Sequence, residues 1–66
     1  MRIIVNGKEQ ELSDRTSIAE LLKIVDVDPE QVVAEHNGQI IAAEHYSAIY
    51  LSDGDVIELI QFVGGG

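Results

Sequence analysis

At 66 residues the chain is long enough for one domain, and its 12 acidic and 4 basic side chains give a formal net charge of −8. A domain of this size buries about 60% of the surface that its unfolded chain exposes, and the 45% of hydrophobic residues suffices for a folded core. The charge disfavours nucleic acid and anionic membranes as partners, and the lack of cysteine excludes disulfides, thiolate metal sites and a persulfide on this chain.

The N-terminal segment predicts a β-hairpin. Arg2 to Val5 is β-branched and apolar, and Asn6-Gly7 follows it. This dipeptide most readily adopts the two positive φ angles of a type I′ turn. Lys8 to Leu12 is therefore expected to return as an antiparallel strand.

A helix is predicted after this hairpin. Ser17 and Glu20 match the capping box S-x-x-E, in which two backbone amides find side-chain acceptors. Four large aliphatic side chains then share one helical face: Ile18, Leu21, Leu22 and Val25. The segment from Asp26 to Pro29 closes a helix of about ten residues, because proline disfavours helical conformation in the residue before it.

The second half of the chain is expected to be mainly strands. Gln31 to His36 and Gln39 to Ala42 flank Asn37-Gly38, which predicts a second hairpin. Ala48 to Leu51 is a candidate short strand, and Val56 to Val63 is the longest apolar strand candidate.

This order of elements predicts an α+β domain of the β-grasp (ubiquitin-like) class, a mixed sheet of four to five strands packed on one helix. We expect the last strand to lie centrally beside the first, with Ile57 and Leu59 facing the helix. Residues 1–63 would form the domain and residues 64–66 a flexible tail. No apolar run approaches the ~20 residues of a membrane span, and the N-terminus does not read as a signal peptide, so a cytoplasmic protein is expected.

The three terminal glycines are the strongest functional signal. Without side chains, Gly64, Gly65 and Gly66 can enter a narrow cleft, and fully extended they reach roughly 10 Å. The terminal carboxylate is a poor electrophile, so it needs activation, for which adenylation by a partner using ATP is suited. We expect the chain itself to bind no cofactor and to be no enzyme.

A docking patch for such a partner is predicted on the sheet face away from the helix. If Ile57 and Leu59 point inward, alternation along the strands places Val33, Ile60 and Phe62 outward.

Histidines and carboxylates offer weaker candidates for chemistry. His36 and His45 have no third ligand at suitable spacing, so a metal site is not expected. A catalytic acid needs a pocket that perturbs its pKa, which so small a sheet hardly provides. Solvated faces and turns are the simpler interpretation of five carboxylates: Glu9, Glu11, Asp53, Asp55 and Glu58.

Five pieces of the chain together form a pattern that is more specific than any one of them: the opening Ile3 to Gly7, the helix start Ser17 to Leu22, the second hairpin Glu35 to Ile41, the turn Asp53 to Glu58 and the ending Phe62 to Gly66. With these pieces, the chain resembles, over nearly its whole length, the ThiS family of thiamine-biosynthesis sulfur carriers.

The resemblance implies that a ThiF-like adenylyltransferase adenylates Gly66, that a sulfur donor such as a cysteine desulfurase supplies the sulfur of a thiocarboxylate, and that thiazole synthase receives it. Ala42 to Tyr46 departs from the family, which often has a Pro-Arg pair and a tryptophan there, and this departure concerns the partner surface.

Three alternatives remain open from the sequence. A ubiquitin-like modifier would join its activated glycine to lysine amines of other proteins. The small subunit of molybdopterin synthase is a sulfur carrier with the same kind of tail, although its members usually run longer. A passive interaction module would not need the terminal glycines.

Overall fold

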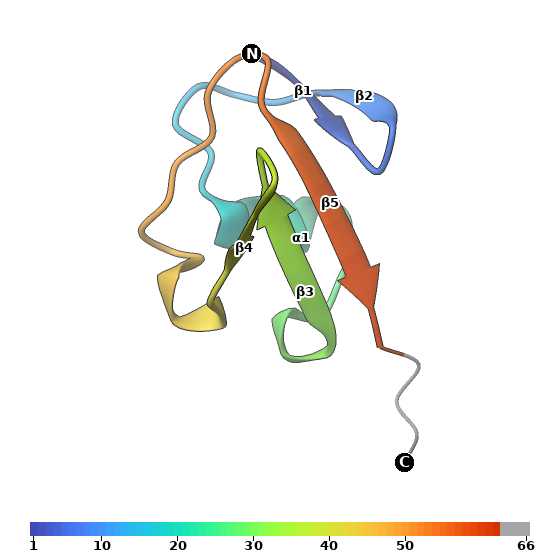
Figure 1. Cartoon of the computed structure of the whole chain (residues 1–66). Helices are drawn as coiled ribbons and strands as arrows, with labels where there is room; N and C mark the ends of the chain where they lie inside the picture. The colour runs from blue at the N-terminus through green and yellow to red at the C-terminus, as the bar shows by residue number, and fades with distance from the viewer. Residues whose placement is uncertain (63–66) are drawn as a thin grey trace.

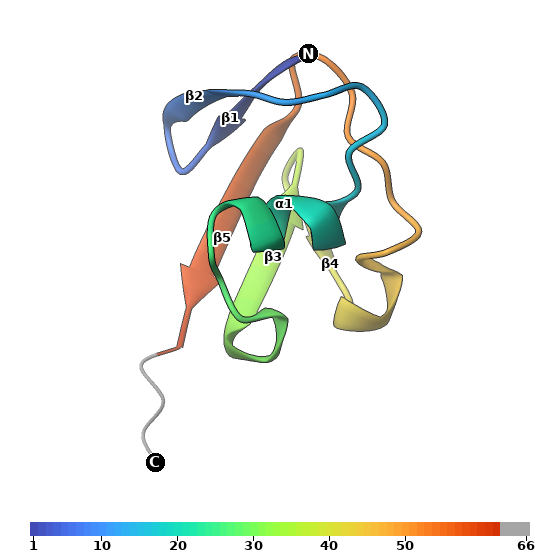
Figure 2. The same cartoon turned by 180° about the vertical axis from the view of Figure 1, so that it is seen from behind.

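The computed structural model describes residues 1–62, a five-stranded sheet with one α-helix across one face, behind the sheet in Figure 1 and in front of it in Figure 2. The predicted domain boundary at Val63 and the tail Gly64 to Gly66 lie outside the described residues. In chain order the elements are β1 (Arg2–Val5), β2 (Lys8–Glu11), α1 (Ile18–Ile24), the 3₁₀ helix η1 (Pro29–Gln31), β3 (Val32–His36), β4 (Gln39–Ile41), the 3₁₀ helix η2 (Ala43–His45) and β5 (Val56–Gln61).

The sheet has the strand order β2-β1-β5-β3-β4, so β5 lies between the two hairpins. It runs parallel to β1 and antiparallel to β3. A mixed sheet packed on one helix confirms the predicted β-grasp fold and the central position of the last strand. Because β5 is bonded on both sides, the chain leaves the sheet from its most enclosed strand.

Both Asn-Gly pairs form the predicted turns. Asn6 and Gly7 have φ angles of 49° and 81°, and Asn37 and Gly38 have 50° and 87°. Positive φ at both central positions is the type I′ geometry, whose twist matches that of the flanking strands.

The two turn asparagines also bond to β5, which the sequence did not predict. Asn6 Oδ1 accepts the Leu59 N–H at 2.7 Å, and Asn6 Nδ2 donates to the Leu59 carbonyl at 3.2 Å. On the other side, Asn37 Oδ1 accepts the Val56 N–H at 2.8 Å, and the Asn37 N–H donates to the Val56 carbonyl at 2.8 Å. Each asparagine thus extends the pairing of β5 beyond the neighbouring strand.

The start of α1 satisfies its free amide groups completely. Ser17 Oγ accepts the Glu20 N–H at 3.1 Å and Glu20 Oε1 accepts the Ser17 N–H at 2.9 Å, which confirms the capping box. The hydrogen bond from the Ser17 backbone, with that from its hydroxyl, lowers the pKa of the Glu20 carboxyl. Ile18 and Ala19 N–H donate to the carbonyls of Ile49 and Tyr46.

The end of α1 has a different cause from the one predicted. The helix is shorter than ten residues because Asp26 adopts a left-handed conformation with φ 59°. Val27 N–H donates to the Leu22 carbonyl at 2.9 Å and Asp26 N–H to that of Lys23 at 3.2 Å, the two bonds of a Schellman motif. Pro29 does not stop α1 but opens η1, where its missing N–H costs nothing.

The predicted strand from Ala48 to Leu51 is wrong. Tyr50 makes only an isolated bridge to Ser17, and the Leu51 N–H donates to the Thr16 carbonyl at 2.8 Å. The backbone of this segment is used to cap the start of α1, as shown by the bond from Ile18 to Ile49. It therefore closes the core beside the helix instead of adding to the sheet.

The core lies between α1 and the inner face of the sheet. Ile57 is fully buried and Leu59 nearly so, which confirms that they face the helix. From the helix, the predicted face is confirmed by buried Ile18, Leu21 and Leu22. Among residues 1–62, no helix is both long and apolar enough to cross a membrane.

Candidate functional site

The predicted reactive residue Gly66 and the access residues Gly64 and Gly65 lie outside the described residues. The structure does show what leads to them. β5 is paired with β3 to its last residue, Gln61 opposite Val32, and the next amide, Phe62 N–H, donates to the Gln31 carbonyl at 2.9 Å. The strand that precedes the tail is thus firmly attached to the sheet.

Val33 on β3 and Ile60 on β5 lie on the sheet face away from α1, because the buried residues beside them, Ala34 and Leu59, face the helix. This face is toward the viewer in Figure 1. Val33 and Ile60 are direct partners across β3 and β5. Ile60 is 51% and Phe62 53% exposed, whereas Val33 is half-buried. The structure therefore gathers these three side chains at the end of β5 that leads to the tail.

Three further apolar side chains belong to the same surface. Ile4 and Val56 are partners across β1 and β5, and Ile40 on β4 is 72% exposed. The strand alternation that predicts an outward Ile60 applies equally to Ile4 and Val56, so the sequence carried a signal for both. We call the whole set the open-face patch: Ile4, Val33, Ile40, Val56, Ile60 and Phe62.

The carboxylates on this sheet face are of two kinds, those that pair with a cation and those that do not. Arg2 forms ion pairs with Glu9 at 3.7 Å and Glu11 at 3.2 Å, which cover the outer edge of the sheet with paired charge. Glu35 and Glu58, in contrast, stand opposite one another across β3 and β5. Of these four acids, Glu11 lines a pocket with a second carboxylate, that of Asp53. Both are already bound by Arg2, whose guanidinium pairs with Glu11 at 3.2 Å and whose backbone N–H donates to Asp53 Oδ1 at 2.7 Å, so they do not form a free catalytic acid pair.

His36 joins a hydrogen-bonded cluster at the turn that enters β5. Its Nε2 lies 2.7 Å from Asp55 Oδ2, which also accepts the Ser52 N–H at 2.8 Å, while Asn37 Nδ2 donates to Asp55 Oδ1 at 3.1 Å. Burial alone would raise the pKa of Asp55, but the bonds from His36, Ser52 and Asn37 outweigh it and lower that pKa. Residues 1–62 contain no group of three metal-ligating side chains, and His45 lies apart in η2. The cluster locks a turn, as predicted for Asp55.

The low pKa of Asp55 makes a prediction about stability. A carboxylate whose pKa is lower in the folded than in the unfolded state stabilises the fold above the unfolded value and loses this effect as the pH falls through the folded value. The Asp55→Asn variant should therefore be less stable than wild type near pH 7, and the difference should shrink below about pH 4. Urea unfolding at several pH values measures it. Glu44→Gln is the control, because Glu44 is exposed. If the stability difference between Asp55→Asn and wild type stays constant with pH, the lowered pKa of Asp55 is contradicted.

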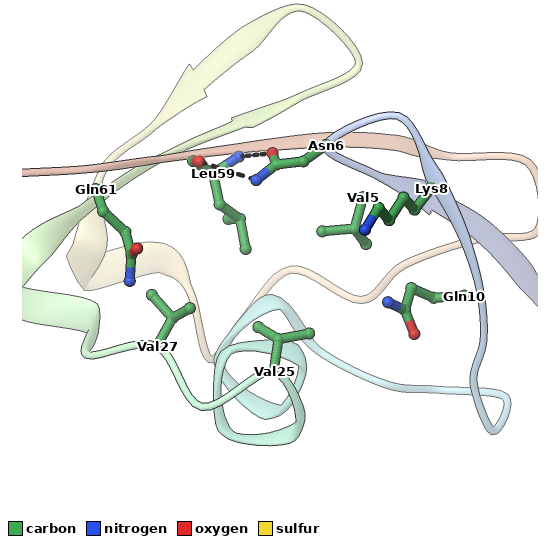
Figure 3. A pocket seen from close by; sticks show the side chains of 8 residues that line it. All are labelled: Val5, Asn6, Lys8, Gln10, Val25, Val27, Leu59 and Gln61. Carbon is green, nitrogen blue, oxygen red and sulfur yellow. Dashed lines mark hydrogen bonds between the residues drawn. The ribbon is translucent and has the colours of Figure 1, made fainter.

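A cavity of about 300 Å³ lies between the end of α1 and the inner face of the sheet (Figure 3). Val25 and Val27 form one wall, and Lys8 supplies the one charged group among the lining residues. Asn6, which also lines it, already bonds with both its side-chain atoms to Leu59. Its lining residues include no nucleophile paired with a base, so the cavity has no catalytic constellation.

The segment from Ala42 to Tyr46 was expected to affect the partner surface. Tyr46 is 3% exposed, and its hydroxyl donates to the Val32 carbonyl at 3.4 Å and accepts the Ala34 N–H at 3.3 Å. This side chain holds the loop to β3, so it belongs to the core and not to a docking surface.

Comparisons with known proteins agree with this description. The model of the ThiS family matches residues 2–66. The sulfur carrier protein ThiS of Bacillus subtilis (strain 168) is 40% identical over 63 residues, 94% of this chain and 96% of that protein. The crystal structure of the thiamine biosynthesis protein ThiS from Geobacter metallireducens matches with a TM-score of 0.86 and 35% identity over the whole of both chains.

The fold, together with the family and structure matches, shows the class of this protein: it is a small β-grasp carrier domain and not an enzyme. The chain belongs to the ThiS family.

A second group of relatives is much longer. The thiazole synthase of Paramagnetospirillum magneticum (strain ATCC 700264 / AMB-1) is 33% identical over 66 residues, which is all of this chain but 20% of that protein. The thiazole synthase of Magnetococcus marinus (strain ATCC BAA-1437 / JCM 17883 / MC-1) matches with the same identity and coverage. This chain therefore spans a fifth of the length of these synthases, which carry a ThiS-like segment within a larger protein.

Proposed function

We propose that this protein is a sulfur carrier in the synthesis of the thiazole ring of thiamine, and that the carboxylate of Gly66 carries the sulfur. The observation that supports this most directly is the family match, which extends through the terminal glycines to residue 66. The relative that covers nearly the same length is a carrier by name.

The chemistry divides between this chain and its partners. The Gly66 carboxylate attacks the α-phosphorus of ATP in a ThiF-like adenylyltransferase and releases pyrophosphate. The terminal sulfur of a persulfide on a donor such as a cysteine desulfurase then attacks the acyl carbon and displaces AMP, which gives an acyl disulfide. A second thiol on a partner protein cleaves that disulfide, releasing the thiocarboxylate and forming a disulfide with the donor sulfur. ATP is bound by the partner, and this requirement for ATP favours a cytoplasmic location. This chain contributes a carboxylate on an unhindered tail and a rigid domain for the partner to hold.

Thiazole synthase is the acceptor in this proposal. Two thiazole synthases contain a segment that matches this chain over its whole length. Joining a carrier to its acceptor in one polypeptide raises their effective concentration, which is useful only if the two interact.

The test is the intact mass of the protein co-expressed with its adenylyltransferase and a cysteine desulfurase. The expected gain is that of one sulfur replacing one oxygen, confined to the C-terminal peptide. A ladder of conjugates in cell extract with ATP would instead support the modifier. A chain that acquires neither adenylate nor thiocarboxylate would exclude the carrier.

The open-face patch supplies the docking surface in this proposal, and Ile60 tests it. The Ile60→Asp variant places a charge where an apolar partner surface would bury it, so we expect binding to the adenylyltransferase to weaken at least about tenfold. Ile24→Asp is the matched control, because Ile24 is 59% exposed but lies on α1. Titration calorimetry with both variants measures the difference, after circular dichroism has shown that both are folded. Equal binding by both variants would contradict this docking surface.

A further inference from the structure

Two glutamates of like charge face one another in the middle of the open-face patch. Glu35 on β3 is the direct partner of Glu58 on β5, so their side chains leave the same face of the sheet. The neighbouring pair on this face is Val33 with Ile60, and Ile40 is the partner of Glu35 on its other side. The two carboxylates therefore lie among apolar groups, of which Ile60 and Ile40 are exposed and Val33 is half-buried.

This arrangement works against the stability of the free domain. Like charges directly opposite on neighbouring strands are destabilising. No ion pair or side-chain hydrogen bond within residues 1–62 involves Glu35 or Glu58. Elsewhere on the same face, two other glutamates are neutralised, since Arg2 pairs with both Glu9 and Glu11. The fold can thus neutralise acids on this surface, yet it leaves this pair without a cation.

A cation from outside fits the pair. An arginine guanidinium is planar, presents several N–H donors in a fixed fork and is weakly hydrated, so it can bind two adjacent carboxylates while its flat faces contact apolar groups. Apolar contact around it would exclude water and strengthen the attraction. The net charge of −8 would also speed the approach of a basic surface.

We propose that Glu35 and Glu58 together receive an arginine side chain of the protein that docks on the open-face patch, the adenylyltransferase in the first instance. This assignment rests on the proposed function and adds the chemical identity of the contact. The pair selects a partner with a basic residue inside an apolar surface, and the repulsion between its carboxylates is relieved only in the complex.

The test uses opposite effects on stability and on binding. Glu58→Gln and Glu35→Gln keep the side-chain size but remove one charge, so each should raise the urea midpoint of the full chain and weaken binding to the adenylyltransferase by about tenfold or more. Glu44→Gln makes the same charge change on an exposed residue of η2 and should alter neither. The weakening should also diminish at high salt, because screening reduces the contribution of charge.

The outcomes separate the two proposals. Binding by Glu58→Gln and Glu35→Gln as tight as by Glu44→Gln would overturn the arginine contact and leave the carrier function intact. A loss of stability in either variant would also overturn it, since the carboxylates would then support the fold. Wild-type protein that binds the adenylyltransferase but is never adenylated would overturn the carrier function alone, and wild-type protein that does not bind would overturn both.

Discussion

Deletion of Gly65 and Gly66 is expected to abolish thiocarboxylate formation and to leave the free energy of unfolding within about 0.5 kcal/mol of wild type. Within residues 1–62, the buried core that holds the domain together consists of residues between Ile3 and Leu59. The shortened chain still ends in a carboxylate, now on Gly64. The deletion therefore tests the position of the reactive group and not its presence.

Intact-mass measurement of the shortened chain, co-expressed with the same partners, shows whether a thiocarboxylate still forms. Urea unfolding of the same preparation shows whether the domain is unaffected. A thiocarboxylate formed on Gly64 as readily as on Gly66 would show that reach is unimportant. A large loss of stability would show that the terminal glycines belong to the fold.

The second large effect is expected from Ile57→Ala in the centre of β5. Ile57 is fully buried, and truncating such a side chain leaves a cavity that costs about 2–5 kcal/mol. A domain of 66 residues has a total stability of roughly 3–10 kcal/mol, taking about 0.05–0.15 kcal/mol per residue. The variant should thus lose a large share of this stability, and carrier activity should fall with the fraction of folded protein. Urea or thermal unfolding followed by circular dichroism measures this loss.

Val56→Ala is the matched control for this variant. Val56 adjoins Ile57 in the same strand but is 40% exposed on the opposite face. Its truncation should change the free energy of unfolding by no more than about 0.5 kcal/mol. Similar losses for the two variants would mean that the faces of β5 are not distinguished as described.

The elements that the sequence predicts well are those whose signals are local. Asn6-Gly7 and Asn37-Gly38 specify their turns because few other residues accept positive φ at two successive positions. Ser17 and Glu20 specify the start of α1 because the capping box joins residues only three apart. Once the two hairpins and the helix are known, the order of layers follows.

The errors arise where a distant partner or a weak local signal decides the conformation. Ala48 to Leu51 has the composition of a strand, but its backbone is used to cap α1, a contact between remote segments. Asp26 ends the helix in a left-handed conformation that glycine would signal clearly and aspartate signals weakly. Burial of Tyr46 likewise depends on β3, which its own neighbours in sequence do not reveal.

The features of the candidate site also differ in whether local sequence signals predict them. Alternation along β5 placed Ile60 outward, because the period of a strand is a local property. Opposition of Glu35 and Glu58 depends on the register between β3 and β5, which sequence alone left undetermined. The reactivity of Gly66 remains a prediction from the family resemblance.

The hydrogen bonds from both hairpin turns to β5 make the strand before the tail inseparable from the rest of the domain. To leave the sheet, β5 must break its pairing with β1 and β3 and the bonds from Asn6 and Asn37. Such an opening removes Ile57 and Leu59 from the core, so it amounts to global unfolding. β5 therefore has no partly detached state of its own, and an enzyme that draws in the tail pulls against the cooperativity of the entire domain.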